Sequence, residues 1–375
     1  MDIYADLGVT PVINAAGTVT AYSGSLMPPE VTDAMNQASR AFVIMEELHL
    51  AAGRRIAELI GVEAAHVCSS ATAGIALMGA ACIAGADPVK IRRLPDVEDA
   101  RHEFVVQRPH RNPYEQAIRM AGGHFVQIEP DVEELQEKLG DQTAAVFHTF
   151  AWLTPGDAIP LPQVAATAHA AGVPVIVDAA SELPPMENLR RFLAEGADLV
   201  VFSGGKGLRG PQSTGLVLGR KDLVEACRLN DCPNMGVGRG MKMGKEEIVG
   251  LVKAVELYMK KDHAAEMSVW ERRVAYILDQ LRDLPHVRAW RQLPAGVGQL
   301  FPHVALSWDE SAMGVSYRTF LDRMLAGPPR IITQFVDPRH FADAPFDEPQ
   351  VRVHVHCLRE GEELIVARRI QELLT

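Results

Sequence analysis

From about residue 47 to residue 255, the sequence alternates short apolar runs with segments of helical character. The runs occupy residues 64–68, 104–106, 125–128, 144–147, 175–177, 199–202 and 215–218. Helix-like segments such as 113–121 and 161–171 separate them. Parallel strands that are buried on both faces have such continuous apolar runs, and helices connect them. The sequence therefore predicts an α/β domain over residues 47–255, built on a mostly parallel sheet of the seven-stranded type.

The sequence on either side of this region predicts a second, smaller domain. A chain of 375 residues, of which 47% are hydrophobic, can form two cores. A long helical pattern covers 248–284, and residues 304–308 and 351–356 read as strands. We expect a C-terminal α+β domain over 256–375, and a segment 1–46 that contributes to this small domain and to the functional site.

Two chemically active residues are predicted at the ends of apolar runs. Lys206 follows the run 199–202 within Ser-Gly-Gly-Lys-Gly-Leu, and Asp178 closes the run 175–177. Ligands of open α/β sheets bind beyond the carboxyl ends of the strands. Glycines beside Lys206 leave room for a planar carbonyl compound to reach its nitrogen. The alternatives are a solvated loop lysine and an aspartate that caps a turn or helix.

A third motif lies upstream of these two residues. Ser70, Ala71 and Thr72 follow the run 64–68 and open an apolar helical segment. Free N–H groups and the helix dipole suit a phosphate there, although an ordinary helix N-cap is the alternative. In chain order, a phosphate site, an acid and a lysine together indicate pyridoxal 5′-phosphate (PLP). The lysine holds its aldehyde as a Schiff base, and Asp178 keeps its pyridine nitrogen protonated as an electron sink.

The motifs at 13–20 (INAAGTVT), 178–181 (DAAS) and 203–212 (SGGKGLRGPQ) resemble those of a known family. Their order is similar to that of fold type I PLP-dependent enzymes, the aspartate aminotransferase-like superfamily. More narrowly, they resemble the selenocysteine synthase-like group, with the closest likeness to the D-glucosaminate-6-phosphate ammonia-lyase branch. The resemblance extends from residue 11 to about residue 255 and is weak beyond.

The resemblance implies a role for each residue of the predicted site. Lys206 and Asp178 would be catalytic. The cofactor-binding residues would be Ser70, Ala71, Thr72, His110, Asp178, Ser181, Ser203 and Lys206. His110 would stack on the cofactor ring, although a plain loop residue is the other interpretation. Ser181 would cap a helix or bind a cofactor oxygen. The resemblance also implies a homodimer or an assembly of dimers.

The type of reaction stays open at this point. A lysine released from PLP is a suitable base for the substrate α-proton. The resemblance favours α,β-elimination with release of ammonia. Racemisation or epimerisation, carbon–carbon lyase chemistry and transamination are the alternatives. The expected substrate is a small polar, hydroxylated amino acid, of which sugar-derived and phosphorylated compounds are examples. Arginines bind carboxylates and phosphates, so Arg239, Arg209 and Arg352 are the candidate anchors.

Composition and charge argue against several other classes of function. A net charge of −11 argues against a nucleic-acid partner. No apolar run is long enough to span a membrane, and the first residues do not resemble a signal peptide. Five scattered cysteines are typical of a reducing, cytoplasmic compartment. His354 and His356 alternate with valines as on a strand, so we expect no metal site. Selenium transfer to a tRNA is not expected either, because the sequence begins close to the 13–20 motif, without the tRNA-binding domain of selenocysteine synthases. A PLP-binding regulator is not expected, because no basic DNA-binding segment is visible.

Overall fold

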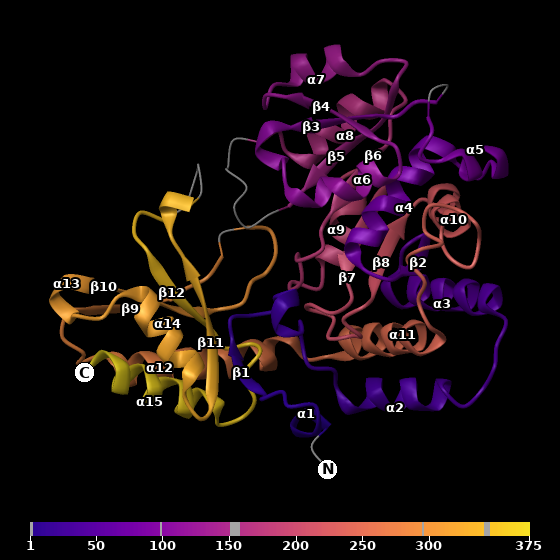
Figure 1. Cartoon of the computed structure of the whole chain (residues 1–375). Coiled ribbons are helices and arrows are strands. Elements are labelled where there is room, and N and C mark those ends of the chain that lie inside the picture. The colour runs from indigo at the N-terminus through magenta and orange to yellow at the C-terminus, as the bar shows by residue number, and fades with distance from the viewer. Residues whose placement is uncertain (1–2, 98–99, 151–157, 295, 341–345) are drawn as a thin grey trace. The chain divides into compact units, whose positions relative to one another are not determined.

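The computed structural model describes residues 3–97, 100–150, 158–294, 296–340 and 346–375. The chain forms two compact units, whose elements are labelled in Figure 1. The larger unit comprises Leu26–Lys261 and Gly296–Gln299. The smaller unit comprises Met1–Ser25, Asp262–Ala295 and Leu300–Thr375.

The larger unit contains a seven-stranded sheet in the order β2-β8-β7-β6-β5-β3-β4. Its strands are β2 (Ala64–Cys68), β3 (Glu103–Gln107), β4 (His124–Ile128), β5 (Thr143–Thr149), β6 (Val175–Asp178), β7 (Leu199–Ser203) and β8 (Gly215–Gly219). Strand β8 runs antiparallel to both of its neighbours, and the other neighbouring strands are parallel. The predicted α/β fold is confirmed, and each of the seven apolar runs forms a strand.

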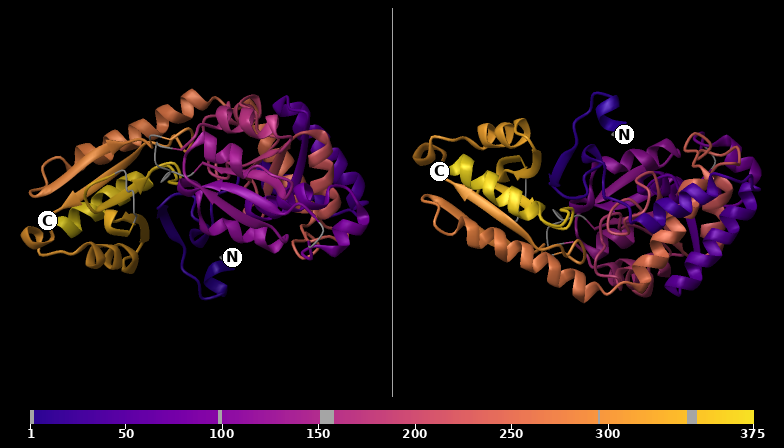
Figure 2. Two further views of the ribbon diagram at one scale, coloured as in Figure 1. Left: turned by 90° about the horizontal axis from the view of Figure 1, so that it is seen from above. Right: turned by 90° about the horizontal axis from the view of Figure 1, so that it is seen from below.

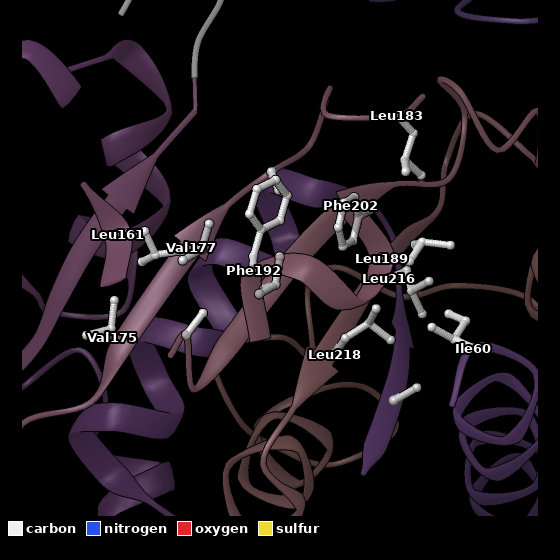
Figure 3. Close-up of a cluster of buried hydrophobic side chains, with 14 of the residues drawn as sticks. Ile60, Leu161, Val175, Val177, Leu183, Leu189, Phe192, Phe202, Leu216 and Leu218 are labelled. Atoms are coloured by element: carbon white, nitrogen blue, oxygen red, sulfur yellow. The ribbon is translucent and has the colours of Figure 1, made fainter. Parts of the chain in front are cut away.

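Helices cover both faces of this sheet (Figure 1). The helices of the larger unit are α2 (Pro29–Ala38), α3 (Met45–Ile60), α4 (Ala71–Ala84), α5 (Pro88–Arg93), α6 (Gln116–Met120), α7 (Val132–Lys138), α8 (Leu161–Ala170), α9 (Asn188–Ala194), α10 (Lys221–Asn230) and α11 (Lys245–Lys260). Successive strand residues point to opposite faces, so one strand serves two cores. On β7, Val200 and Phe202 pack into one buried cluster, whereas Leu199 and Val201 pack into another. Figure 3 shows Phe202 in the first of these clusters.

The larger unit begins at Leu26, whereas the sequence placed the start of the large domain at residue 47. The reason is the packing of α2 along α11. A Cβ atom added to Gly250 of α11 would lie only 2.9 Å from Cγ of Met35 in α2, so the two helices approach closely at this glycine. The segment 26–46 therefore packs with the larger unit.

The smaller unit contains a five-stranded sheet in the order β1-β11-β12-β10-β9. Its strands are β1 (Val12–Ala15), β9 (Val287–Gln292), β10 (His303–Trp308), β11 (Arg330–Val336) and β12 (Gln350–His354). Its helices are α1 (Ile3–Asp6), α12 (His263–Leu281), α13 (Glu310–Met313), α14 (Tyr317–Ala326) and α15 (Glu362–Leu374). Helices α12 (orange) and α15 (yellow) lie side by side in Figure 2. Apolar side chains of α12, α14 and α15 pack with those of the sheet into one core.

One helical prediction was wrong. The pattern at 248–284 is divided between α11 and α12, which are separated at Lys261 and Asp262. Lys261 has extended backbone angles, and the Asp262 side chain accepts a hydrogen bond of 2.9 Å from the Ala265 N–H. An aspartate in this position begins a new helix, because it satisfies a first-turn N–H group. Within the described residues, no helix is both long and apolar enough to cross a membrane.

Because several histidines are buried, we expect the stability of the fold to fall strongly at acidic pH. Burial lowers the pKa of His49 in the larger unit, and of His303 in the smaller unit, to about 4. Each ring is therefore neutral in the folded protein, whereas the unfolded chain binds a proton below about pH 6.5. Stability is fully present above that pH. As the pH falls from 6.5 toward 4, we expect each of these histidines to lower the free energy of unfolding by about 1.4 kcal/mol per pH unit.

Thermal unfolding between pH 7 and pH 5 measures this effect. The variant His49→Phe keeps a ring against His66, with which His49 is stacked, but cannot be protonated. We expect a shallower fall of the melting temperature with pH in this variant. His124→Gln, at an exposed position, is the control for the loss of a histidine. Equal slopes in wild type and His49→Phe would contradict the interpretation.

Candidate active site

The sheet brings the predicted residues to one edge. Strands β2, β6 and β7 run in the same direction, so their carboxyl ends lie at the same edge of the sheet. Asp178 is the last residue of β6, and Ser203 is the last residue of β7. Ser70 follows β2, and Lys206 follows β7 by three residues. Topology alone therefore places these four residues at the edge where ligands of such sheets bind.

Lys206 is partly buried and is held by the turn after β6. Its Nζ donates a hydrogen bond of 2.5 Å to Ser181 Oγ. Burial lowers the pKa of Lys206, while the nearby carboxyls of Asp178 and Glu182 oppose this shift. A lowered pKa increases the fraction of neutral amine, which is the form that acts as a nucleophile or a base.

Asp178 is a buried acid that is 6% exposed. Its Oδ1 accepts a hydrogen bond of 3.0 Å from the Ala180 N–H. Burial raises the pKa of Asp178, and this N–H and Lys206 oppose the shift. A buried carboxyl needs a cationic partner to be ionised, and a protonated pyridine nitrogen is such a partner.

The turn after β2 offers backbone N–H groups to an anion. Ser70 is the N-cap of α4, and its hydroxyl accepts a hydrogen bond of 2.9 Å from the Ala73 N–H. The N–H groups of Ala71 and Thr72 belong to the first helical turn, which has no preceding carbonyl to bind them. Ser70 is therefore a helix N-cap, which was the alternative to a phosphate site in the prediction from the sequence. The same turn nevertheless presents the geometry that binds phosphate.

The glycines around Lys206 serve a purpose that the sequence did not reveal. A Cβ atom on Gly205 would lie 2.6 Å from Cα of Gln212, and one on Gly207 would lie 2.7 Å from the carbonyl oxygen of Leu183. Both glycines thus let two stretches of protein backbone approach each other. These glycines therefore allow tight packing of the turn that carries Lys206, and the predicted room for the cofactor stays a prediction.

His110 lies in the 3-10 turn Arg108–His110 that follows β3 and is 2% exposed. Its ring lies edge-on to that of His148 in β5, with 4.3 Å between the ring centroids. Burial lowers the pKa of His110 to about 4, so the ring is neutral. A neutral ring is suited to stacking on a cofactor, which stays a prediction for this residue.

Glu182 also lies at this edge of the sheet, in the turn after β6, and is not among the residues predicted from the sequence. It is 3% exposed and lies one residue beyond Ser181. Burial and the charge of Asp178 raise its pKa to about 8. The one signal in the sequence is a carboxylate four residues after Asp178, and such a residue most often caps a helix or faces solvent.

The three predicted arginines lie in different environments. Arg209 is in the turn that carries Lys206, has a positive φ of 55°, and donates a hydrogen bond of 3.1 Å from Nε to the carbonyl of Leu26. Arg239 is exposed on the loop after α10. Arg352 is buried on β12 of the smaller unit, with its guanidinium 5.1 Å from the centroid of the Phe346 ring. Only Arg209 shares a turn with Lys206.

The histidines near the C-terminus lie on and after β12. His354 Nε2 lies 2.8 Å from Oε1 of Gln334, and the His354 ring stacks on that of His303. Within the part of the chain that the structure describes, no three His, Cys, Asp or Glu side chains are grouped so that they could hold a metal ion.

The donor set at the sheet edge fits PLP. The aldehyde of PLP requires an amine, and Lys206 has a lowered pKa. The pyridine nitrogen requires an acid, and Asp178 is a buried carboxyl that needs a cation. The phosphate requires N–H donors, and the N-terminus of α4 has free N–H groups. We therefore take the residues present as suited to hold this cofactor.

A glycine substitution tests the phosphate turn. A Cβ atom on Gly215 would lie 2.7 Å from the backbone nitrogen of Ala71 and closer still to the Ser70 carbonyl group. Gly215→Ala should therefore displace the turn, weaken PLP binding and cost about 1–3 kcal/mol of stability. Gly240→Ala is the control, since a Cβ there meets nothing within 4 Å. Fluorescence titration with PLP and thermal unfolding measure both effects. Equal PLP affinity in the two variants would contradict the role of this turn.

Comparison with known proteins agrees with this geometry. Residues 123–297 match the aminotransferase class-V family. The chain is 35% identical to 5′-C-glycyluridine monooxygenase-decarboxylase from a Streptomyces species, over 99% of this chain and 92% of that protein. It is also 35% identical to D-glucosaminate-6-phosphate ammonia lyase from Salmonella typhimurium, over 68% of this chain and 70% of that protein.

A solved structure and more distant relatives extend the comparison. The structure of D-glucosaminate-6-phosphate ammonia-lyase superposes with a TM-score of 0.85 and 28% identity, over 100% of this chain and 98% of that chain. The L-seryl-tRNA(Sec) selenium transferase of Serratia proteamaculans is 27% identical, over 96% of this chain and 82% of that protein. The chain belongs to the selenocysteine synthase-like group of fold type I PLP-dependent enzymes, as the motifs around Asp178 and Lys206 predicted.

Proposed function

We propose that this protein is a lyase that performs α,β-elimination, with release of ammonia, on a small polar, hydroxylated amino acid. Sugar-derived and phosphorylated amino acids are the first candidates. Elimination needs a base for the α-proton and an acid for the departing hydroxyl. The observation that carries the proposal is the base: Lys206, a partly buried amine at the strand edge, whose pKa is lowered by burial and whose Nζ donates a hydrogen bond to Ser181 Oγ. The likeness to an ammonia lyase supports it.

The cofactor would be held by residues from three strand ends. Lys206 Nζ would bind its aldehyde carbon, and Asp178 would face its pyridine nitrogen. The N–H groups of Ala71 and Thr72, with the hydroxyl of Ser203, would bind its phosphate. When bound, PLP supplies an electron sink for the pair released at the substrate α-carbon.

Lys206 would remove the α-proton. Its Nζ is already close to Ser181 Oγ, which accepts a hydrogen bond and so holds the amine in place. Burial favours the neutral form of this amine, and the neutral form accepts a proton. For the anionic part of the substrate, we propose Arg209 first because it shares the turn of Lys206. Arg239 and Arg352 are the further candidates.

A second reaction is supported by a specific observation. The likeness to a monooxygenase-decarboxylase covers 99% of this chain. Oxidative decarboxylation of an amino acid joined to a nucleoside is therefore the alternative to elimination. The two reactions break different bonds at the α-carbon: the bond to hydrogen in elimination, and the bond to the carboxylate in decarboxylation. Racemisation and transamination share the loss of the α-proton with elimination, whereas carbon–carbon lyase chemistry breaks a carbon–carbon bond of the α-carbon instead.

We also propose a homodimer, or an assembly of dimers, in the cytoplasm. Between α2 and α3, Phe42, Val43 and Ile44 are consecutive exposed apolar residues. Such patches mark protein interfaces more often than free surface. None of the five cysteines, all of which the structure describes, forms a disulfide bond. Light scattering on the active enzyme measures its mass, and a monomer would contradict the proposal.

A substrate screen tests the proposed reaction. Hydroxy amino acids of both configurations, including phosphorylated and sugar-derived ones, are incubated with the PLP-loaded enzyme. We expect release of ammonia and a keto acid in equal amounts, together with α-deuterium exchange. Exchange with inversion but without ammonia would indicate a racemase or epimerase. Uptake of oxygen with release of carbon dioxide from a nucleoside-linked amino acid would favour the alternative reaction.

Reductive trapping tests the assignment of Lys206. Borohydride treatment of the PLP-loaded enzyme, followed by peptide mapping, should label Lys206, and Lys206→Ala should remove the label and the yellow colour. Lys242→Ala, an exposed lysine in a glycine-containing loop, is the matched control and should keep both. A label on Lys242 or Lys245 instead would show that the central assignment is wrong.

A further inference from the structure

Glu182 is placed in the turn that binds Lys206. This turn follows β6, and its Ser181 accepts the hydrogen bond from Lys206 Nζ. Glu182 is the next residue, is 3% exposed, and interacts electrostatically with both Lys206 and Asp178. Its carboxyl therefore belongs to the same buried polar group as the predicted base and the predicted partner of the pyridine nitrogen.

A distant segment of the chain fixes this residue. Residues Gly296–Gln299 belong to the larger unit. Asn188 Nδ2 donates hydrogen bonds of 2.8 Å to the carbonyl groups of both Glu182 and Val297. A Cβ atom on Gly298 would overlap with both Cα and Oε2 of Glu182, so only glycine fits there. The side chain of Gln299 forms a hydrogen bond with the Glu182 carboxyl.

One oxygen of this carboxyl is left for a ligand. Glu182 Oε1 is buried and has no hydrogen-bond partner among the residues that the structure describes. Buried polar side-chain atoms of native proteins usually have a partner, and an exception at a functional site points to a group that arrives with the ligand. An oxygen atom of a bound substrate is such a group.

The protonation state of Glu182 follows from its surroundings. Burial raises the pKa of its carboxyl most, and the charge of Asp178 adds to this, whereas Gln299 and Lys206 oppose the shift. The resulting pKa of about 8 keeps the carboxyl protonated at neutral pH. A protonated carboxyl can donate a hydrogen bond or a proton, which an ionised one cannot.

We infer that Glu182 is the general acid that protonates the departing β-oxygen of the substrate. This inference rests on the proposed elimination. Lys206 Nζ takes the α-proton, and the electron pair of that C–H bond forms the new Cα–Cβ double bond. The Cβ–O bond breaks with its electron pair on oxygen, and the proton of Glu182 converts the leaving group into water. The Lys206 ammonium then returns a proton to the Glu182 carboxylate, so both groups recover their starting states.

Two substrates distinguish a general acid at Glu182 from a residue with a binding or structural role. A β-hydroxy amino acid has a leaving group that needs a proton, whereas its β-chloro analogue releases chloride without one. In the PLP-loaded enzyme, Glu182→Gln should lower ammonia release from the hydroxy substrate by about 10²- to 10⁴-fold. It should leave elimination from the chloro analogue, and α-deuterium exchange with the hydroxy substrate, within a few-fold of wild type. Glu182→Asp should recover part of the lost activity.

Glu187→Gln is the matched control, since Glu187 lies five residues further along, is exposed and makes no capping hydrogen bond. It should behave as wild type with both substrates. Equal activity of wild type and Glu182→Gln on the hydroxy substrate would overturn the role of Glu182 alone. Equal loss with both substrates, together with loss of exchange, would also overturn it and would indicate a binding or structural role. Failure of the wild type with every hydroxy amino acid would overturn the lyase proposal itself.

A spectroscopic measurement checks the proton directly. The infrared difference spectrum between PLP-loaded wild type and Glu182→Gln should contain the C=O band of a protonated carboxylic acid at pH 7. This band should disappear as the pH is raised through about 8. A carboxylate band at pH 7 in place of it would overturn the inference, whatever the activity of the variants.

Discussion

The site depends on one constraint, which is the free energy that it costs to ionise buried side chains. These side chains lie at the carboxyl ends of the strands of the larger sheet. Asp178, Glu182 and Lys206 lie within electrostatic reach of one another, so their opposite charges attract. Burial nevertheless raises the pKa of both carboxyls and lowers that of the lysine. Desolvation therefore outweighs the attraction, and the group is biased toward neutral species rather than a buried ion pair. A neutral amine and a neutral acid are the forms that begin a proton transfer.

The fold supplies this environment through strands that are buried on both faces. Along β7, alternate residues fill two separate cores, so water is excluded from either side of the strand that leads to Lys206. Close backbone contacts then seal the turns at the strand end, with Gly205 against Gln212 and Gly215 against the turn at Ser70. The apolar cores and the glycines thus serve one purpose: they limit the access of water to the polar side chains at the strand ends and restrict the movement of these side chains.

Much of this arrangement could be predicted from the sequence because it depends on local patterns. Doubly buried strands are continuous apolar runs, and Asp178 and Lys206 are conspicuous because each follows such a run. Glu182 could not be found in this way, because its burial depends on Gly298 and Gln299, which lie more than a hundred residues further along the chain. The packing role of Gly205 and Gly207 could not be found for the same reason, because the backbone that they contact belongs to other turns of the chain. The break at Asp262 was missed because an N-cap inside a helical pattern looks like one more polar residue.

The position of the protons also bears on the choice between the two candidate reactions. Elimination of a hydroxyl creates an oxygen base as the bond to the β-carbon breaks, and a protonated carboxyl lowers the cost of that charge. Decarboxylation itself releases neutral carbon dioxide and creates no such base, but its oxidative form also reduces O2, and reduced oxygen takes up protons. The Glu182 carboxyl is held protonated by burial, and its Oε1 has no partner among the described residues, so it can serve either reaction as a proton donor. It would favour elimination where it faces the β-oxygen of the substrate, and oxygen reduction where it faces the oxidant. The choice between the two reactions therefore depends on which oxygen atom the Glu182 carboxyl contacts.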